Sequence, residues 1–368
     1  MKIDFVDLKR QNRIYRKEFI KALSSVVNDA SFIYGPELTT FENDFAHFCG
    51  KKYCVGMNSG TDALMLALLA YGIKPGDEVI TVPNSYFSTA MVISNIGAIP
   101  VFVDINPQTY NIDVTRIEEK ISKKTKAIIP VHLYGQAADM DTIVSIAKKY
   151  NLIIIEDCCQ AHGAKYKGKL LPHTETGAFS FYPGKNLGSF GDGGAVVTDN
   201  IEIKEKLEYL HNDGSKEKYE HKMFGYKSRL DTLQAAILSV KLKYLNEFVE
   251  KRRKAAQLYN KKLAGIKQIK TPYEAEYAYH AYHIYAILSN KRDELQNYLF
   301  KNGIQTVVHY PTPIHLQTPY LKMGFRKGDF PLSESHSKNV LALPIFPEIT
   351  EKEIAYIAKT IKNFYSLA

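Results

Sequence analysis

One lysine, Lys185, stands in a glycine-rich turn between two short apolar runs. The runs AFSFYP (178–183) and GAVVTD (194–199) are typical of buried strands, and the intervening GKNLGSFGDGG has no apolar periodicity. A lysine there is either a solvated loop residue or an amine that a rigid scaffold presents to a pocket. In a pocket, desolvation or nearby positive charge would populate the neutral amine, which is the form that attacks carbonyl groups.

An acidic pair, Glu156 and Asp157, ends the apolar run LIIIEDC (152–158). Open α/β sheets place their ligand sites at the carboxyl ends of strands. A carboxylate buried there needs a cationic partner, because an unpaired buried charge is costly. Taken alone, Asp157 is explained equally well by a salt bridge or a helix cap. His162, further along the same segment, is expected to be structural.

Ser59, Gly60 and Thr61 stand between an apolar strand and an apolar helix, within NSGTDALMLAL (58–68). A helix start made of small residues can bind phosphate through free backbone N–H groups and the positive end of the helix dipole. Taken alone, a simple N-cap is the commoner explanation. Tyr86, in TVPNSYFSTA, follows another apolar strand and offers an aromatic face.

Together these features suit one cofactor, pyridoxal 5′-phosphate (PLP). Its phosphate needs N–H donors, its ring needs an aromatic plate, its pyridine nitrogen needs an acid and its aldehyde needs an amine. The helix start, Tyr86, Asp157 and Lys185 offer these groups in chain order. An NAD-binding protein is disfavoured, because no GxGxxG follows the first strand and opens a helix.

The elements that must position these residues alternate between short apolar strands and helical segments from residue 53 to about 200. Strands that are apolar throughout are typical of a parallel or mixed sheet covered by helices on both faces. The expected strands are 53–58, 77–83, 99–104, 126–133, 152–158, 178–183 and 194–199, with helices near 61–72, 86–98, 114–122 and 139–151.

The second half of the chain changes pattern. A long helix is predicted from about 229 to 262, and a smaller α+β unit follows, with a helix near 292–302 and a closing helix from 350. No flexible linker separates the two parts. We therefore predict a large α/β domain with an N-terminal helical segment over 1–250, and a small C-terminal domain over 251–368.

The bulk composition is that of an ordinary globular protein. The 368 residues are 45% hydrophobic and 24% charged, with a net charge of +9 that is spread along the chain. A nucleic-acid partner is not expected, because basic and aromatic residues do not cluster. The N-terminus is charged and no apolar run approaches the ~20 residues of a membrane span, so no membrane partner is expected. Two of the four cysteines are adjacent and none has CxxC spacing, so we expect reduced thiols and no metal in a cytoplasmic protein.

The sequence resembles the PLP-dependent nucleotide-sugar aminotransferases of the DegT/StrS type, which have fold type I, over essentially the whole chain. The matching segments are IYGPELTTFENDFA, NSGTDALMLAL, GDEVITVP, VHLYGQAADMD, EDCCQAHGA, SFYPGKNLGSFGDGGAVVTD, GYKSRLDTLQAAIL and HYPTPIH. The resemblance implies an α/β fold in which the large domain has a mixed, mostly parallel seven-stranded sheet and the small C-terminal domain is α+β.

The resemblance also implies roles for single residues. Lys185 falls on the lysine that carries the cofactor, and Asp157 on the residue paired with the pyridine nitrogen; both are predicted to be catalytic. Gln160 falls near the ring hydroxyl and Tyr86 on the stacking position. The predicted phosphate-binding residues are Ser59, Gly60, Thr61 and Ser180.

In this family the loop GYKSRLD reaches into the site of the partner subunit, so a homodimer with shared active sites is implied. The usual residue at position 227 is asparagine, but here Lys227 would meet the phosphate as a point charge. Arg229, His309 and Tyr310 resemble wall residues near the sugar nucleotide, although simple loop structure explains them equally well. The predicted substrate-binding residues are Tyr182, Asn186, Arg229, His309 and Tyr310.

The resemblance implies transamination, with L-glutamate as the donor and a nucleotide-linked keto-sugar as the acceptor. The segment GDGGAVVTD after Lys185 is similar to the branch that aminates C3 of dTDP-3-keto-6-deoxyhexoses. Amination at C4 of a dTDP- or UDP-4-keto-6-deoxy sugar is the alternative, and a non-catalytic PLP or nucleotide-sugar binding protein is a weaker one. Related dehydratases carry histidine at the position of Lys185, which argues against that activity.

Overall fold

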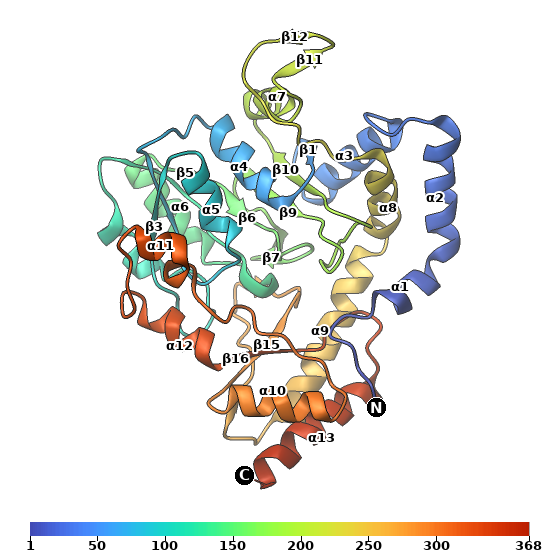
Figure 1. The fold of residues 1–368 in the computed structure, drawn as a ribbon, viewed down its shortest axis with the longest axis vertical. Coiled ribbons are helices and arrows are strands. Elements are labelled where there is room, and N and C mark those ends of the chain that lie inside the picture. Colours follow the sequence, from blue (N-terminus) through green and yellow to red (C-terminus); the bar gives the residue numbers. More distant parts are fainter. Residues whose placement is uncertain (368) are drawn as a thin grey trace.

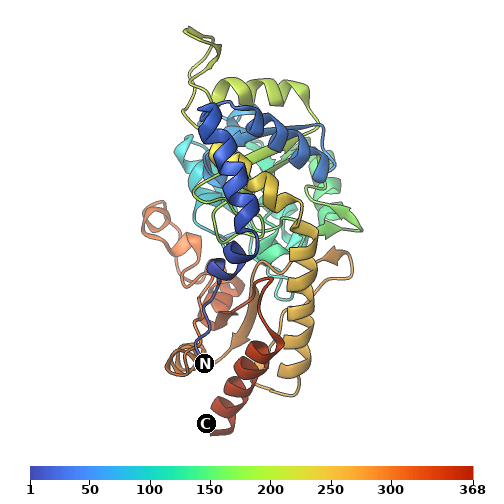
Figure 2. The ribbon, with the colours of Figure 1, turned by 90° about the vertical axis from the view of Figure 1, so that its right-hand side faces the viewer.

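The structure, a computed structural model, describes residues 1–367. A body of sheet and helices forms the upper part of the molecule in Figure 1, and a smaller unit with both chain ends lies below it. Figure 2 shows the first helices running down one side of the larger body toward the smaller one. Three N-terminal helices begin the chain: α1 (Leu8–Ile14), α2 (Arg16–Asp29) and α3 (Pro36–Phe48).

A seven-stranded sheet forms the centre of the large body within residues 1–367, in the order β1–β10–β9–β5/β6–β4–β2–β3. Short β5 and β6 are one strand interrupted at Ile155, whose N–H still donates to the Ile128 carbonyl (3.1 Å). β10 is antiparallel to both neighbours and the other pairs are parallel, so the predicted mixed, mostly parallel sheet is confirmed. The bounds are β1 Tyr53–Met57, β2 Glu78–Thr81, β3 Ile99–Phe102, β4 Thr125–Ile128, β5 Ile153–Ile154, β6 Glu156–Asp157, β9 Thr176–Ser180 and β10 Gly194–Thr198.

Helices cover both faces of this sheet. Successive strand residues point to opposite faces, so Ala178 of β9 enters one apolar core while Phe179 enters the other. The first core also holds side chains of α4, α5 and α7, and the second those of α3, α6 and α8. This arrangement explains why the strands are apolar throughout. The bounds are α4 Gly60–Ala70, α5 Ser88–Asn95, α6 Met140–Tyr150, α7 Ile201–Leu210 and α8 Thr232–Leu242.

Two helix predictions were wrong. The single helix expected over 229–262 is two helices, α8 and α9 (Leu245–Leu263), broken at Lys243 and Tyr244. The core of the large sheet holds α8 and the first turns of α9 (Leu245, Val249), and the rest of α9 (Ala256, Tyr259) packs in the core of the smaller unit. No proline or glycine marks the break. The helix expected near 114–122 is two short 3₁₀ turns, η1 (Val114–Arg116) and η2 (Glu118–Lys120).

The smaller unit surrounds an antiparallel sheet in the order β13–β15–β16, which shares an apolar core with α9, α10 and α13. Ile3 belongs to this core and pairs with Ile304, so the first residues of the chain join the C-terminal unit. The division at residue 250 stays a prediction. The bounds are β13 Ile269–Lys270, β15 Tyr285–Ser289, β16 Val340–Leu343, α10 Arg292–Lys301 and α13 Glu351–Leu367.

The remaining elements are short. β14 (Ala278–Tyr279) pairs with β7 (Lys165–Tyr166) and thereby ties the C-terminal part to the large body, while β11 and β12 form a hairpin that projects from the top of the molecule in Figure 1. Within residues 1–367 no helix combines the length and the apolar character needed to cross a membrane. The other bounds are β8 Lys169–Leu170, β11 Ser215–Glu217, β12 Glu220–His221, η3 Leu133–Gly135, η4 Ile314–Leu316, α11 Thr318–Lys322 and α12 Pro331–Asn339.

Three buried histidines, His162, His280 and His336, make the fold sensitive to acid. Burial lowers the pKa of each to about 3, whereas an unfolded histidine titrates near 6.5. Between these values the unfolded chain binds more protons, so stability is complete above about pH 6.5 and is lost as the pH falls. We expect each histidine to lower the free energy of unfolding by on the order of 1 kcal/mol per pH unit, as measured by urea unfolding at pH 7, 5.5 and 4.5.

The control for this prediction is His162→Phe. The His162 ring lies 5.2 Å from the Phe179 ring and 5.9 Å from the Phe181 ring, in apolar surroundings that suit a phenyl ring. The variant should lose less stability than the parent over the same pH range. An identical slope in the two proteins would contradict the assignment.

Candidate active site

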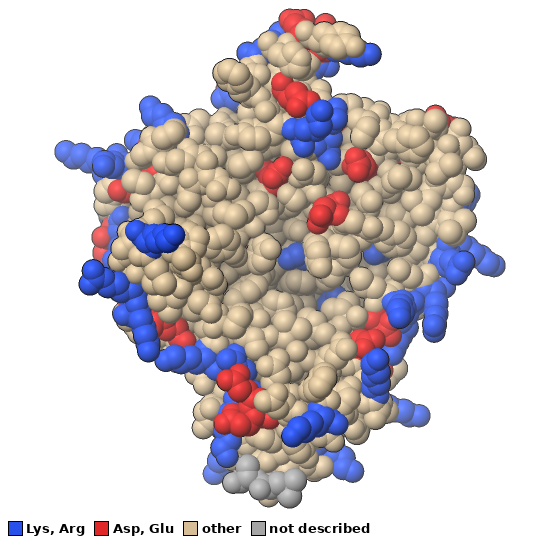
Figure 3. Space-filling view, viewed as in Figure 1, with Lys and Arg blue, Asp and Glu red and all other residues tan. Residues whose placement is uncertain are grey.

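A cavity of about 640 Å³ lies where the large sheet meets the smaller unit. Figure 3 shows a hollow at the centre of this face, with acidic side chains above it and basic atoms visible within it. The carboxyl ends of β1, β2, β6 and β9 lead into the cavity, as expected for an open α/β sheet. The predicted site residues among its lining are Ser59, Gly60, Thr61, Tyr86, Asp157, Gln160, Ser180, Tyr182, Lys185, His309 and Tyr310.

One end of the cavity is the start of α4. Ser59 caps this helix by accepting from the Asp62 amide (3.1 Å), so the predicted N-cap is present. Gly60 and Thr61 are the first helical residues, and their N–H groups have no acceptor inside the helix. A Cβ at Gly60 would lie only 2.5 Å from the Ser180 Cβ, so glycine is needed for the helix to approach β9 this closely. Ser59 therefore caps the helix while the N–H groups of Gly60 and Thr61 remain available to an anion.

Asp157 lies on the floor of the cavity and is 4% exposed. Its Oδ2 accepts from the Thr89 hydroxyl (2.8 Å), and its Oδ1 accepts from the Cys159 amide (3.1 Å). Among the ion pairs of residues 1–367 none includes Asp157, and neither of these bonds is a helix cap. The salt-bridge and helix-cap explanations of Asp157 are therefore wrong. A buried carboxylate that faces a cavity and has no ion-pair partner suits a cationic ligand.

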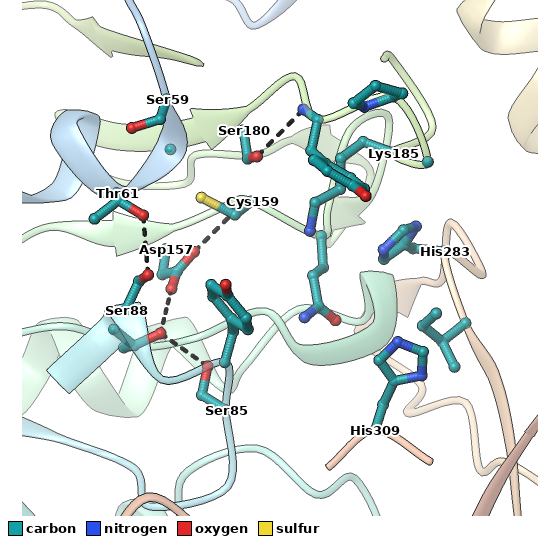
Figure 4. Close-up of a pocket in the computed structure, with 18 of the residues that line it drawn as sticks. Ser59, Thr61, Ser85, Ser88, Asp157, Cys159, Ser180, Lys185, His283 and His309 are labelled. Atoms are coloured by element: carbon teal, nitrogen blue, oxygen red, sulfur yellow. Dashed lines mark hydrogen bonds between the residues drawn. The ribbon is translucent and has the colours of Figure 1, made fainter. Parts of the chain in front are cut away.

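Lys185 extends into the space between Asp157 and His283 (Figure 4). Its backbone N–H donates to the Tyr182 carbonyl (2.9 Å), which fixes the turn that follows β9. Burial lowers the pKa of the Lys185 amine, while the nearby Cys159 and Asp157 oppose this effect. The neutral, nucleophilic form is thus more populated than it would be on a solvated lysine.

The other end of the cavity is formed by the smaller unit. Gln160 Nε2 donates to the Tyr310 hydroxyl (2.9 Å), and the ring of Tyr86, 58% exposed, lies 6.0 Å from the ring of Tyr310. In Figure 4, His283 and His309 lie opposite the helix start, with Lys185 between. Burial, reinforced by Lys185, lowers the pKa of His309 to about 4, so this imidazole is neutral at neutral pH.

Three predicted residues do not reach this cavity. The Asn186 side chain is buried and donates to the Ala281 carbonyl (3.1 Å), so it points away from the predicted substrate position. Arg229 donates to the Asn212 side chain (2.9 Å). Lys227 lies beside Asp213 (3.7 Å), with its side chain 70% exposed at the base of the projecting hairpin.

Several lining residues were missed from the sequence. Thr89 could have been suspected, because Ser85, Ser88 and Thr89 cluster around Tyr86 in an otherwise apolar stretch. Cys159 and Asp192 lie in the segments of Asp157 and Lys185 but were not singled out, and the others come from distant segments that only the fold brings here. These additional lining residues include Phe5, Val6, Leu8, Cys159, Asp192, His283 and Ile284.

The residues present fit PLP. The close approach of α4 to β9 leaves a cradle that a Cβ at Gly60 would fill, and its N–H donors suit a phosphate. Asp157 lacks the cation that a protonated pyridine nitrogen would supply, and Lys185 offers an amine of lowered pKa between the two ends. Figure 4 shows Ser59, Thr61 and Ser180 grouped above Asp157, on the side of the pocket opposite His283 and His309.

Comparison with known proteins agrees with this fit. The sequence profile of the DegT/DnrJ/EryC1/StrS aminotransferase family matches residues 13–362. A dTDP-3-amino-3,6-dideoxy-α-D-galactopyranose transaminase from Aneurinibacillus thermoaerophilus is 45% identical, covering 98% of this chain and 99% of that protein. A protein from Geobacillus stearothermophilus named pleiotropic regulatory protein is also 45% identical, with 99% of each chain covered.

Solved structures share the fold. DesV from S. venezuelae has a TM-score of 0.97 at 40% identity, covering 99% of this chain and 98% of that one. NtdA from Bacillus subtilis, solved with its cofactor PMP, has a TM-score of 0.91 at 34% identity, covering 98% and 85%. Since the family profile spans nearly the whole chain, which also has the fold of these solved relatives, the chain belongs to the DegT/DnrJ/EryC1/StrS aminotransferase family and is a PLP-dependent nucleotide-sugar transaminase.

Proposed function

We propose that this transaminase moves an amino group from L-glutamate to C3 of a dTDP-linked 3-keto-6-deoxyhexose. The product would be a dTDP-3-amino-3,6-dideoxyhexose of the gluco or galacto series, a precursor for surface polysaccharide. The observation that carries the proposal is 45% identity, over 98% of the chain, to the Aneurinibacillus transaminase whose name gives this sugar.

In this proposal the chain holds PLP along the cavity floor. When bound, PLP supplies an aldehyde that links to amines and a ring that accepts electrons from the adjoining carbon. The start of α4 and Ser180 would hold the phosphate, Tyr86 would stack on the ring and Gln160 would lie near the ring hydroxyl. Asp157 would keep the pyridine nitrogen protonated, and the Thr89 hydroxyl (2.8 Å) would orient the carboxylate.

Lys185 would act twice. Between turnovers it carries the cofactor, and after the donor releases it the free Nζ takes the proton from the α-carbon of glutamate. In the second half of the reaction the same atom delivers a proton to C3 of the sugar. Burial, which lowers the pKa of Lys185, favours the neutral form that the first proton transfer requires. Tyr182, His309 and Tyr310 line the side of the cavity where we place the sugar.

The position of amination decides the proposal. The holoenzyme should be incubated with glutamate and, in separate reactions, dTDP-linked 3-keto- and 4-keto-6-deoxyhexoses and a UDP-linked 4-keto sugar. NMR of the product then identifies the carbon that carries the amine and its configuration. Amination at C3 with the dTDP sugar supports the proposal, and amination at C4 overturns it; Lys185→Ala serves as the enzyme-dead control.

We also propose that the enzyme is a homodimer with shared active sites. Among the cavity-lining residues of the described chain, the cation is Lys185, whose amine the cofactor's aldehyde engages. The phosphate dianion would then lack a cation if only one chain supplied the site. The hairpin of residues 212–227 projects into solvent with Phe224 fully exposed, a position from which Lys227 of a second copy could supply that charge.

Lys227→Ala is expected to weaken PLP binding about tenfold, the size of one charge-assisted hydrogen bond of about 1.4 kcal/mol. PLP titration followed by absorbance measures this change. Lys218→Ala, on the same hairpin, is the matched control and should bind PLP normally. At limiting PLP, a mixture of Lys227→Ala and Lys185→Ala should be more active than the two variants measured separately, because one kind of mixed site is intact. Unchanged PLP affinity in Lys227→Ala would count against the assignment.

A further inference from the structure

Tyr134 has a backbone conformation that is unusual for a residue with a side chain. It lies in η3 with φ 59° and ψ 4°, in the left-handed region. This conformation costs on the order of 1 kcal/mol for a non-glycine residue, so surrounding contacts must hold it in place. Tyr134 is 4% exposed and lies just behind the cavity, between the large body and the smaller unit. None of the roles assigned above uses it.

The backbone of Tyr134 orients a cofactor-side residue. Its N–H donates to Gln160 Oε1 (2.8 Å), so the carbonyl side of the Gln160 amide must face Tyr134. The Nε2 of Gln160 is then turned toward the Tyr310 hydroxyl (2.9 Å). The carbonyl of Tyr134 accepts from the Ile284 amide (3.3 Å), next to His283 in the cavity wall. One residue thus contacts segments from both parts of the chain.

The hydroxyl of Tyr134 holds the opposite wall. It donates to the backbone carbonyl of His309 and lies 3.0 Å from Nε2 of His336 on α12. A tyrosine hydroxyl has one proton, and here that proton is donated to the His309 carbonyl. The hydroxyl oxygen must therefore accept from His336, whose Nε2 carries a proton. Burial lowers the pKa of His336 to about 3, so the ring is neutral and this tautomer is fixed. His336 therefore donates to the Tyr134 hydroxyl, which in turn donates to the His309 carbonyl, and the two hydrogen bonds strengthen each other.

We propose that Tyr134 is a positioning residue that holds His309 and Tyr310 at a fixed distance from Gln160. If the Tyr134 hydroxyl were removed, the His309 carbonyl would lose a buried donor. The 309–310 segment would then lose its direct hydrogen bond to the large body at this point. The effect of losing the hydroxyl should fall on the sugar, which we place against these residues, and not on the cofactor, because the backbone bond that orients Gln160 remains. The inference rests on the proposed position of the sugar.

The test uses two matched tyrosines. Tyr134→Phe removes the hydroxyl and keeps the backbone bond to Gln160. Tyr110→Phe is the control, because the Tyr110 ring packs on the same histidine (centroids 4.2 Å apart) while its buried hydroxyl has no partner among the described residues. We expect Tyr134→Phe to raise KM for the keto-sugar about fivefold, the size of one lost hydrogen bond. PLP content and the half-reaction with glutamate should be unchanged, and Tyr110→Phe should match the parent.

A second readout does not depend on turnover. Hydrogen–deuterium exchange of the peptide covering 305–312 should become faster in Tyr134→Phe and stay unchanged in Tyr110→Phe. His336→Phe removes the donor to the Tyr134 hydroxyl but keeps the hydroxyl, so it should shift both measurements in the same direction by less. This variant also tests the arrangement if Tyr134→Phe folds poorly.

The outcomes separate the two proposals. If the parent enzyme aminates no dTDP-keto-sugar, the proposed substrate is wrong, yet the exchange rates still decide the role of Tyr134. If exchange and KM are both unchanged in Tyr134→Phe, the positioning role is overturned. An equal loss in the glutamate half-reaction and in PLP content would also overturn it, because it would indicate a general structural role.

Discussion

Replacing Lys185 with alanine is expected to lower turnover by about 10⁴-fold or more. In the proposed mechanism the substitution removes the amine that carries the cofactor and, with it, the base that moves the proton. General acid–base catalysis alone contributes roughly 10²–10⁴-fold. PLP should still bind, because Asp157 and the start of α4 remain in place. Steady-state kinetics and the absorbance of the bound cofactor measure the two expectations separately.

A second buried lysine provides the control for this experiment. Burial lowers the pKa of Lys241 to about 8, so its amine also has an enriched neutral form. Its Nζ, however, donates to the Gly188 carbonyl (2.7 Å) and lies outside the cavity lining. Borohydride reduction of the parent holoenzyme should therefore fix the cofactor on the peptide of Lys185 and not on that of Lys241. A tag on any other peptide would refute the assignment of Lys185.

Asp157→Asn is expected to lower kcat by roughly 10²–10³-fold at saturating PLP, the range seen when a group that stabilises developing charge is removed. An amide cannot keep the pyridine nitrogen protonated, so the ring becomes a weaker electron acceptor. The variant should keep nearly the parent stability, because the asparagine oxygen can accept from the Cys159 amide while its NH2 donates to the Thr89 hydroxyl oxygen. Full activity at saturating PLP would contradict the role of Asp157.

The neighbouring carboxylate is the matched control. Glu156 points to the other side of the strand, where His132 lies 2.8 Å away and Thr174 donates from both its amide and its hydroxyl. Burial alone would raise the pKa of Glu156, but these hydrogen bonds outweigh it and hold the pKa below its ordinary value. Glu156→Gln should therefore lower the free energy of unfolding by about 1–3 kcal/mol while kcat stays near the parent value. The two adjacent residues should thus separate catalysis from stability.

The strands and most helices of the large sheet were predictable, because buried parallel strands leave a continuous apolar signal and their helices begin at small polar residues. The breaks within the expected helices were not predictable. Lys243 and Tyr244 are ordinary helix residues, and the chain bends there before α9 continues from the core of the large sheet into that of the smaller unit. A change of packing surface has no local signature when neither proline nor glycine marks it.

The site residues also include some that the sequence could identify and some whose position it could not. Ser59, Asp157 and Lys185 were identifiable because each directly follows or ends an apolar strand, and strand ends of one sheet meet at one edge. Asn186 was predicted to reach the substrate by its place in the motif, but its side chain turns into the protein to hold Ala281. The direction of a side chain in a glycine-rich turn depends on which partner the surrounding fold supplies.

The sequence by itself therefore determined the fold class, the cofactor and several residues that line the cavity, among them Ser59, Asp157 and Lys185, since these residues stand at successive strand ends. Only the tertiary structure decided what closes the other side of the cavity. Phe5, His283 and His309 come from opposite ends of the chain, and Tyr134 reaches His309 across the two parts of the molecule. Such contacts arise from the packing of whole elements, and no local spacing in the sequence encodes them.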